Sequence, residues 1–352
     1  MPNTSSYAVA PGGGNNAFIP TFSAATGQIQ IEFTRSVNRF PITQYAQIVP
    51  VQQMSGYYLK IDEQETARVV NTQDLQWPLG EDRPTGINSD FEFNQFTCQR
   101  FQTSFHIPQE TARQAQWDVV ASHARIAAAK MMTHRSLRMA TQLTTSSNYT
   151  SSGGGQNYYA NASDLVASTD ITTDPDGVQK IIRAAIERIV QNTVGAVSAK
   201  DILLVVNPIT ARIMATSAGV RDYVKNYPAA LSFLKGDDTF AAYGLPQTLF
   251  GLGGVVVDDT VRVSSRKGAT DARGFFYGTA SAPGMVFVSR PGGLVGNEGP
   301  SFSTATIFAY EDMTVETMED PWNRRVRGSV TDNSATVLTA ALSGLYIADA
   351  NT

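Results

Sequence analysis

The most informative shortage in this 352-residue sequence is that of charged side chains, which make up 16% of it, whereas about a quarter is usual for soluble proteins. A monomer needs a charged exterior to stay dispersed, but a subunit that covers its surface with copies of itself does not. The shortage therefore indicates either an obligate oligomer or a neutral extracellular protein rich in Ser, Thr and Gln. The net charge of −4 argues against a protein that binds nucleic acid over its whole surface.

Cysteine and histidine are nearly absent. The single cysteine, Cys98, excludes an internal disulfide framework and any CxxC metal site. Only three histidines are present, His106, His123 and His134, and the last two lie about three turns apart on one predicted helix, beyond joint reach of a metal. We therefore expect no metal and no cofactor.

Catalytic motifs and membrane signals are missing as well. The sequence contains no GxSxG, P-loop or HExxH pattern, and the glycines at 251–254 precede a strand, so they do not fit a dinucleotide-binding loop. The first residues lack the basic and apolar regions of a signal peptide. The longest apolar-leaning uncharged stretch, 239–257, contains Pro246 and four glycines, which is unlike a membrane span. We expect a soluble protein that is made in a cytoplasm, has no membrane partner and is not an enzyme.

The first hundred residues predict an extended arm followed by β-structure. Residues 1–31 carry no charged side chain and include the run Gly12–Asn16, so this segment has too few large apolar groups to fold alone. From residue 44 to 105, aromatic and β-branched residues alternate with polar ones, as in a long hairpin exposed on both flanks. A two-stranded excursion of this kind is marginal by itself, so neighbouring subunits could supply the missing contacts.

A long helix is predicted from Gln109 to about Thr145, because Pro108 opens a segment without further proline or glycine. It could break near Thr133. Its charges are mostly basic, which fits either a solvated helix face or a surface that lies on a polyanion such as packaged DNA. The basic residues are Arg113, Arg125, Lys130, Arg135 and Arg138.

The second half has the alternating pattern of predicted helices and strands that is typical of an α/β domain. A Ser/Thr/Asn/Gly linker at 144–164 marks a boundary. An amphipathic helix is predicted at 178–192, followed by a buried strand at 201–207 and a helix that begins at Pro208. Further strands are predicted near 254–258, 275–277, 284–288, 313–318 and 326–330.

The order of these parts resembles the Hong Kong 97-type major capsid proteins of tailed phages: arm, hairpin, long helix, flexible break and α/β domain. Four segments carry the resemblance: 205–208, 249–257, 311–315 with the basic residues at 324–327, and 336–348. It implies an α+β fold with an N-arm, a β-hairpin E-loop, a spine helix in a peripheral domain and an α/β axial domain. The implied boundaries are N-arm 1–43, E-loop 44–105, peripheral domain 106–165 and 306–335, and axial domain 166–305 and 336–352.

The same resemblance implies a function and partners. Copies of the chain would form pentamers and hexamers of an icosahedral virion shell around double-stranded DNA, assembled in the cytoplasm of a host bacterium. A portal is a further implied partner, as are possible scaffolding or decoration proteins; because the sequence begins directly with the arm, we expect no fused scaffolding extension. Some relatives join subunits by a Lys–Asn isopeptide bond, for which the corresponding residues here are Lys60 with Asn323 or Asn333.

Two rival interpretations remain at this stage. The first is an encapsulin-like bacterial compartment, which shares this fold but usually begins with a helix, unlike the Gly/Asn/Ser/Thr-rich start here. The second is a secreted β-rich surface protein, suggested by the Tyr, Asn and Ser/Thr content, against which the missing signal peptide and the long Ala-rich helix both count.

Overall fold

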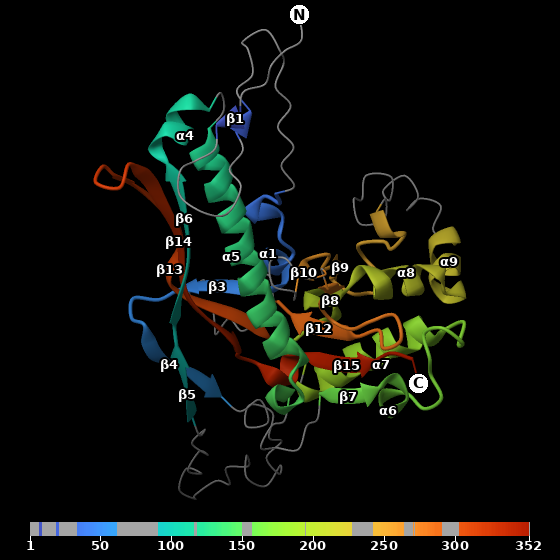
Figure 1. Cartoon of the computed structure of the whole chain (residues 1–352). Coiled ribbons are helices and arrows are strands. Elements are labelled where there is room, and N and C mark those ends of the chain that lie inside the picture. The colour runs from blue at the N-terminus through green and yellow to red at the C-terminus, as the bar shows by residue number, and fades with distance from the viewer. Residues whose placement is uncertain are drawn as a thin grey trace, which may run out of the picture.

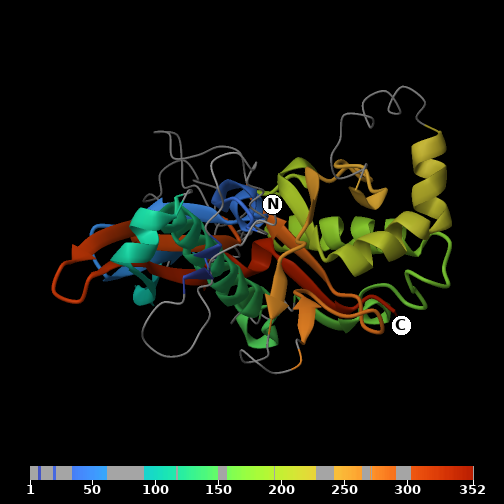
Figure 2. The ribbon, with the colours of Figure 1, turned by 45° about the horizontal axis from the view of Figure 1, so that its top comes forward.

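One long helix, α5 (Val119–Thr144), runs between two β-sheets in an elongated molecule (Figure 1). A ribbon of two strands forms one end of the molecule and α9 (Ala218–Lys225) the other, as the turned view also shows (Figure 2). The structure is a computed structural model, and it describes residues 7–8, 19–20, 34–61, 91–115, 118–149, 157–193, 195–226, 242–263, 270, 272–290 and 303–351.

The α/β half contains a five-stranded mixed sheet. Its strand order is β7-β15-β12-β8-β9, in which the β7–β15 and β8–β9 pairs are parallel and the two central pairs antiparallel. The strands are β7 (Tyr158–Asn161), β8 (Ile202–Val206), β9 (Gly254–Val257), β12 (Met285–Ser289) and β15 (Leu345–Asp349).

Both faces of this sheet are buried, which explains its nearly continuous apolar strands. Alternate residues of β8 point to opposite faces: Leu204 packs under helices α7 (Gly177–Asn192) and α8 (Pro208–Thr216), and Val205 packs toward α5. Helix α8 begins where the sequence predicts, because Asn207 caps it by accepting a hydrogen bond from the Thr210 amide at 2.7 Å and Pro208 occupies its first turn.

The other sheet has four strands in the order β3-β13-β14-β6. Its centre is a long antiparallel ribbon, and β14 also pairs antiparallel with β6 while β3 runs parallel to β13. These strands are β3 (Gln47–Pro50), β6 (Gln99–Pro108), β13 (Ala305–Asp320) and β14 (Arg325–Leu338). One face packs on α5 through Val330. Within the sheet, Gly328 of β14 lies opposite Phe105 of β6, whose ring comes so close that a Cβ at Gly328 would lie 2.1 Å from it.

Helix α5 joins the two sheets into one structure. Its N-terminal half contacts the four-stranded sheet through Ala127 and Met131. Its C-terminal half packs through Met139 and Leu143 on the five-stranded sheet, together with Ile42 of α1 (Ile42–Tyr45). A helix that serves two cores needs a wider buried face than a single stripe, and α5 has one.

The predicted break in the long helix is misplaced. The segment ends first as α4 (Gln109–Gln114) and restarts as α5 at Val119, whereas Thr133 lies inside α5. The reason is local: Ala115 adopts an extended backbone, and Asp118 starts the new helix by accepting a hydrogen bond from the Ala121 amide at 2.9 Å.

The predicted hairpin is present, formed by β4 (Ser55–Ile61) and β5 (Phe91–Thr97), which pair antiparallel. It projects from the four-stranded sheet (Figure 1) and is anchored by Phe96, which stacks on Phe308 with 4.2 Å between ring centroids. Strand β3, which the sequence places in the hairpin region, belongs to the four-stranded sheet, and β6 continues across residue 105.

Smaller elements complete the described chain. Two short antiparallel pairs are present, and residues 62–90 of the predicted hairpin region and most of the arm lie outside the described residues. The remaining elements are β1 (Tyr7–Ala8), β2 (Ile19–Pro20), α6 (Ala162–Leu165), β10 (Val261–Val263) and β11 (Arg273–Phe275).

Candidate assembly and DNA-contact surfaces

Two of the five basic residues predicted to face DNA form ion pairs with a buried aspartate inside the protein. The Arg135 side chain is 3% exposed, and its Nη2 lies 2.5 Å from Oδ1 of Asp332, a fully buried residue of β14. Arg138 donates to the other oxygen of Asp332 at 2.7 Å and to the Ser334 carbonyl at 2.9 Å. Arg135 also reaches Asp312 of β13 at 2.8 Å.

This arginine–aspartate cluster (Arg135, Arg138, Asp312 and Asp332) holds α5 on the four-stranded sheet. Two guanidinium groups and two carboxylates balance in charge, which is how an ionic group can be accommodated in an interior. Burial alone would lower the pKa of Arg135, but the hydrogen bonds to Asp332 and Asp312 raise it. Arg135 and Arg138 are therefore structural, and the expectation that they face DNA is corrected.

The other three predicted DNA-facing residues are exposed. Arg113 lies on α4, and Arg125 and Lys130 lie on α5. Nη2 of Arg125 donates to Ser122 Oγ at 3.1 Å, which leaves its guanidinium at the surface. Lys130 makes no ion pair within the part of the chain that the structure describes.

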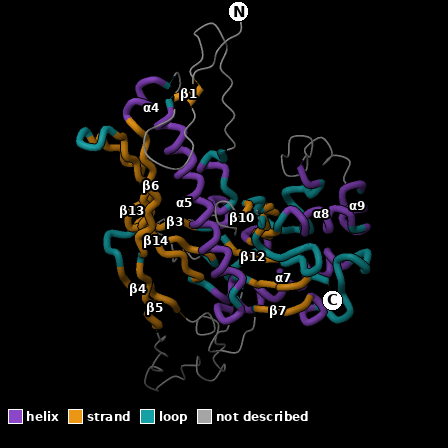
Figure 3. The backbone as a smooth tube through the Cα atoms, viewed as in Figure 1, coloured by secondary structure: helices purple, strands orange, loops and turns teal. Residues whose placement is uncertain are grey.

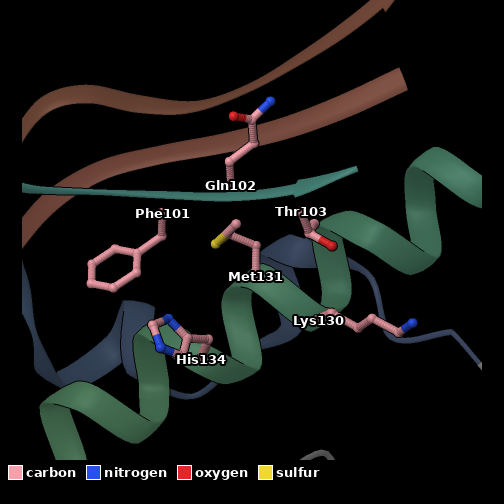
Figure 4. A pocket seen from close by; sticks show the side chains of 6 residues that line it. All are labelled: Phe101, Gln102, Thr103, Lys130, Met131 and His134. Carbon is pink, nitrogen blue, oxygen red and sulfur yellow. The ribbon is translucent and has the colours of Figure 1, made fainter. Parts of the chain in front are cut away.

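A groove of about 200 Å³ lies between α5 and β6 (Figure 4). Its walls come from Phe101 and Thr103 on the strand and from Lys130, Met131 and His134 on the helix. The Phe101 ring and the His134 imidazole lie 4.7 Å apart. In the close-up the Lys130 side chain runs along the helix and its ammonium points away from the Phe101–His134 pair. Burial lowers the pKa of His134, and the nearby Arg138 lowers it further, which favours the neutral imidazole. The lining therefore combines the apolar side chains of Phe101 and Met131 with polar groups, and Lys130 is its basic member.

Large apolar side chains are exposed at two protrusions. On the β4–β5 hairpin, Tyr57 and Phe93 are each 67% exposed; they lie on the same face because Tyr57 pairs with Gln95 and Leu59 with Phe93. At the tip of the β13–β14 ribbon, Trp322 is 94% exposed. Neither position was singled out from the sequence, although Pro321-Trp322-Asn323 between two strands is a recognisable turn pattern.

The turn that carries Trp322, residues 321–324, is braced by one carboxylate. Asp320 accepts hydrogen bonds from the amide and side chain of Asn323, at 3.2 and 2.8 Å, and from Arg325 at 3.3 Å. Arg327 lies 2.7 Å from the same carboxylate. The Asn323 side chain first, and then the Asn323 amide and the two arginines, lower the pKa of Asp320 to about 2.

The three residues predicted for a covalent crosslink are placed very differently. Lys60 occupies β4 opposite Glu92, but its side chain lies outside the described part of the structure. Asn323 is exposed at the ribbon tip. Asn333 is 3% exposed in the middle of β14, where a lysine of another subunit could not reach it, so the expectation for Asn333 is corrected.

A second buried carboxyl group lies beyond the end of β9. Asp258 is fully buried and accepts a hydrogen bond from the Tyr45 hydroxyl at 3.2 Å and from the Thr260 amide at 3.1 Å. The Tyr45 hydroxyl also lies 2.9 Å from that of Tyr277. Burial raises the pKa of Asp258 and raises those of both tyrosines well above their usual range. This tyrosine–aspartate cluster (Tyr45, Asp258 and Tyr277) ties α1 to the five-stranded sheet.

Within the described ranges, no group of three or more His, Cys, Asp or Glu side chains could hold a metal ion. Among the helices that the structure describes, none is long and apolar enough to cross a membrane. Cys98 is buried, with its Sγ 3.5 Å from the Phe308 carbonyl oxygen.

No family model and no curated protein matches this chain, but solved structures do. A phage-related protein from Bordetella bronchiseptica RB50 is 18% identical with a TM-score of 0.59, covering 89% of this chain and 93% of its own. The mature capsid of bacteriophage PhiM1 gives 12% identity, a TM-score of 0.59 and coverages of 93% and 91%. The capsid of cyanophage P-SCSP1u is 12% identical with a TM-score of 0.56, covering 98% of this chain and 97% of its own.

The SrpI encapsulin of Synechococcus elongatus PCC 7942 is also similar, with 9% identity, a TM-score of 0.50 and 94% of each chain covered. Its lower score places the phage capsids ahead of the compartment shell. These likenesses extend over nearly the whole chain. The prediction of a Hong Kong 97-type architecture is thus confirmed, and the chain has the fold of the bacteriophage capsid proteins.

Proposed function

We propose that this protein is the major capsid protein of a tailed phage, and that its copies form the pentamers and hexamers of an icosahedral head. The observation that carries the proposal is the match to phage capsid subunits over more than nine tenths of both chains. The two protrusions support it, because their exposed aromatic side chains would be covered by neighbouring subunits. The role is structural, and the protein resides in the virion after assembly in the bacterial cytoplasm.

The proposed division into domains follows the two sheets. The four-stranded sheet with α5 would be the peripheral domain and the five-stranded sheet with α7 and α8 the axial domain, with the β4–β5 hairpin as the E-loop. The N-arm would lie over neighbouring subunits, and a portal and scaffolding or decoration proteins would complete the particle.

Electron microscopy of the purified chain tests this function. Icosahedral shells are the expected result; a protein that stays monomeric at all concentrations would refute the proposal. A shell that encloses a co-expressed bacterial enzyme and never DNA would favour the encapsulin alternative.

Contact with packaged DNA would fall on Arg113 and Arg125, which are both exposed. Non-specific contacts with phosphate weaken as salt rises, because bound counterions are released on binding. The double variant Arg113→Gln/Arg125→Gln should release DNA at lower salt while it still assembles empty shells. The matched control is Arg183→Gln/Arg212→Gln on α7 and α8, where both residues are also exposed; equal retention by both variants would refute the DNA contact.

A covalent bond between subunits is proposed only for Lys60 with Asn323, the exposed asparagine. A denaturing gel of reduced particles would show a ladder of linked chains. A monomer band alone, or a ladder that persists in Lys60→Arg, would refute the bond.

A further inference from the structure

The tip of the β13–β14 ribbon presents one large ring to solvent. At 94% exposed, Trp322 is the most exposed of the large apolar side chains in the described residues. The turn projects at the edge of the molecule (Figure 3), well away from the centre of α5. Tryptophan is enriched among the residues that dominate binding energy at interfaces, so a ring held this far from its own chain indicates a binding role.

Hydrogen bonds also hold the tip in one conformation, which favours binding. The four donors on the Asp320 carboxylate fix the turn on both sides of Trp322. Since the pKa of Asp320 is about 2, this bracing persists at any pH at which a shell assembles. A side chain on a fixed turn loses little conformational freedom on binding, which favours affinity.

The groove between α5 and β6 offers a complementary surface. Its volume of about 200 Å³ suits one flat aromatic ring, and its lining of Phe101, Met131 and His134 supplies the edge-to-face and sulfur contacts that aromatic rings favour. The Thr103 hydroxyl is an acceptor within the groove for an indole N–H. The described chain leaves this groove unfilled by its own side chains (Figure 4).

Charge complementarity identifies the occupant. Lys130 at the groove rim has no ion pair among the described residues, and the ribbon carries the exposed carboxylate of Glu319 close to its tip. A second copy of the chain can therefore supply both an aromatic ring for the groove and a carboxylate for Lys130.

We propose that Trp322 of one copy inserts into the α5–β6 groove of a second copy, with Glu319 beside Lys130. This inference rests on the proposed self-assembly and names one contact through which it occurs. The contact joins two different patches, so it is heterologous and closes only when copies are arranged in a ring. It assigns Lys130 to a subunit interface and leaves Arg113 and Arg125 for DNA.

Assembly of the full-length chain measures the contribution of the ring. Trp322→Ala should raise the concentration needed for shell assembly at least about tenfold, the order expected for an interface anchor, whereas Trp322→Phe should recover most of the loss. The control Val263→Ala removes apolar surface at another exposed position, 53% exposed on β10, and should leave assembly unchanged. Wild-type assembly by Trp322→Ala would overturn the proposal.

Disulfide trapping identifies the receptor. Two single variants, Pro321→Cys, which keeps the Trp322 ring, and Lys130→Cys, are assembled together and oxidised with diamide; disulfides form only where Cα atoms approach within about 7 Å. The expected product is a linked dimer that appears in the mixture and in neither variant alone, which also controls for Cys98. Dimers from Pro321→Cys alone would show tip-to-tip contact and overturn the groove assignment, as would shells without any dimer. If the wild type forms no shells before oxidant is added, the proposed function itself has failed.

Discussion

Two buried aspartates show how differently one residue type is accommodated in the two halves of the molecule. Asp332 in the four-stranded sheet and Asp258 beyond the five-stranded sheet are both fully buried. Asp332 lies between the guanidinium groups of Arg135 and Arg138, so its charged partners are two cations. Asp258 has hydroxyl groups and an amide as its partners, and its raised pKa shows that burial favours its neutral form.

The difference matters because each aspartate fastens a different element. The arginine–aspartate cluster fixes the orientation of α5 on the sheet that bears the ribbon, through charge and geometry. The tyrosine–aspartate cluster fixes α1, the helix that precedes β3 and the β4–β5 hairpin in the chain, through hydrogen bonds to hydroxyl groups. Losing one partner of a buried ion pair strongly lowers stability, because the remaining charge is left unpaired in the interior. Losing one partner of a neutral cluster removes a hydrogen bond and lowers stability less.

The largest effect is therefore expected at Asp332. Asp332→Ala should lower the free energy of unfolding by about 3–5 kcal/mol, because it leaves Arg135 buried without its main partner. Urea unfolding of the unassembled chain measures this loss.

The control for that variant is Asp312→Ala, which removes the exposed partner of the same Arg135. The Asp312 side chain is 67% exposed, so its loss should cost less than about 1 kcal/mol. Equal losses of unfolding free energy in the two variants would contradict the distinction between a buried ion pair and an exposed one. Replacing all three buried charges together, Arg135→Met/Arg138→Met/Asp332→Leu, should restore much of the lost stability.

A smaller effect is expected for the neutral cluster. Tyr45→Phe removes the hydroxyl that donates to Asp258 and contacts Tyr277, and it should cost about 1–3 kcal/mol, the range for leaving one buried polar group unsatisfied. The same unfolding measurement applies, with Tyr57→Phe as the matched control because that side chain is 67% exposed and should change nothing. A loss as large as that of Asp332→Ala would remove the contrast.

Much of the fold was predictable because local sequence patterns indicate its elements. The amphipathic period predicts α7, the Asn-Pro pair predicts the start of α8, and the apolar run predicts β8, all near their observed bounds. Strand β7 was missed because Tyr158–Asn161 follows a run of small polar residues and owes its conformation to β15. The break after α4 depends on one capping aspartate, Asp118, in an otherwise helical pattern.

The surfaces were less predictable than the fold, for a physical reason. A count of basic residues on α5 cannot distinguish Arg125 from Arg135, since the main partner of Arg135, Asp332, lies 197 residues away on β14. Arg135 falls on the part of the helix that faces the sheet, and only the paired strands show that Asp332 lies opposite. Likewise, Trp322 is important because its own chain leaves it uncovered, which no local pattern reveals.

The smallest change in stability, with a distinctive pH dependence, is expected for Asp258→Asn. At neutral pH this variant should stay within about 1 kcal/mol of the wild type, because the Asn oxygen still accepts from the Thr260 amide and the Asn nitrogen can donate to the Tyr45 hydroxyl oxygen. In the wild type the folded chain retains the Asp258 proton above pH 4, where an unfolded aspartate releases it. The wild-type stability from this group is therefore complete below about pH 4 and falls as pH rises toward the raised folded-state pKa. Between pH 4.5 and 7.5 the unfolding free energy of the wild type should fall relative to that of Asp258→Asn; this difference cancels the opposite contribution of His134, whose pKa is lowered. Asp259→Asn, which replaces a partly exposed carboxylate paired with Arg35, should follow the wild type. If the wild type and Asp258→Asn changed in parallel, or if Asp258→Asn lost as much stability as Asp332→Ala, the contrast between the two clusters would fail.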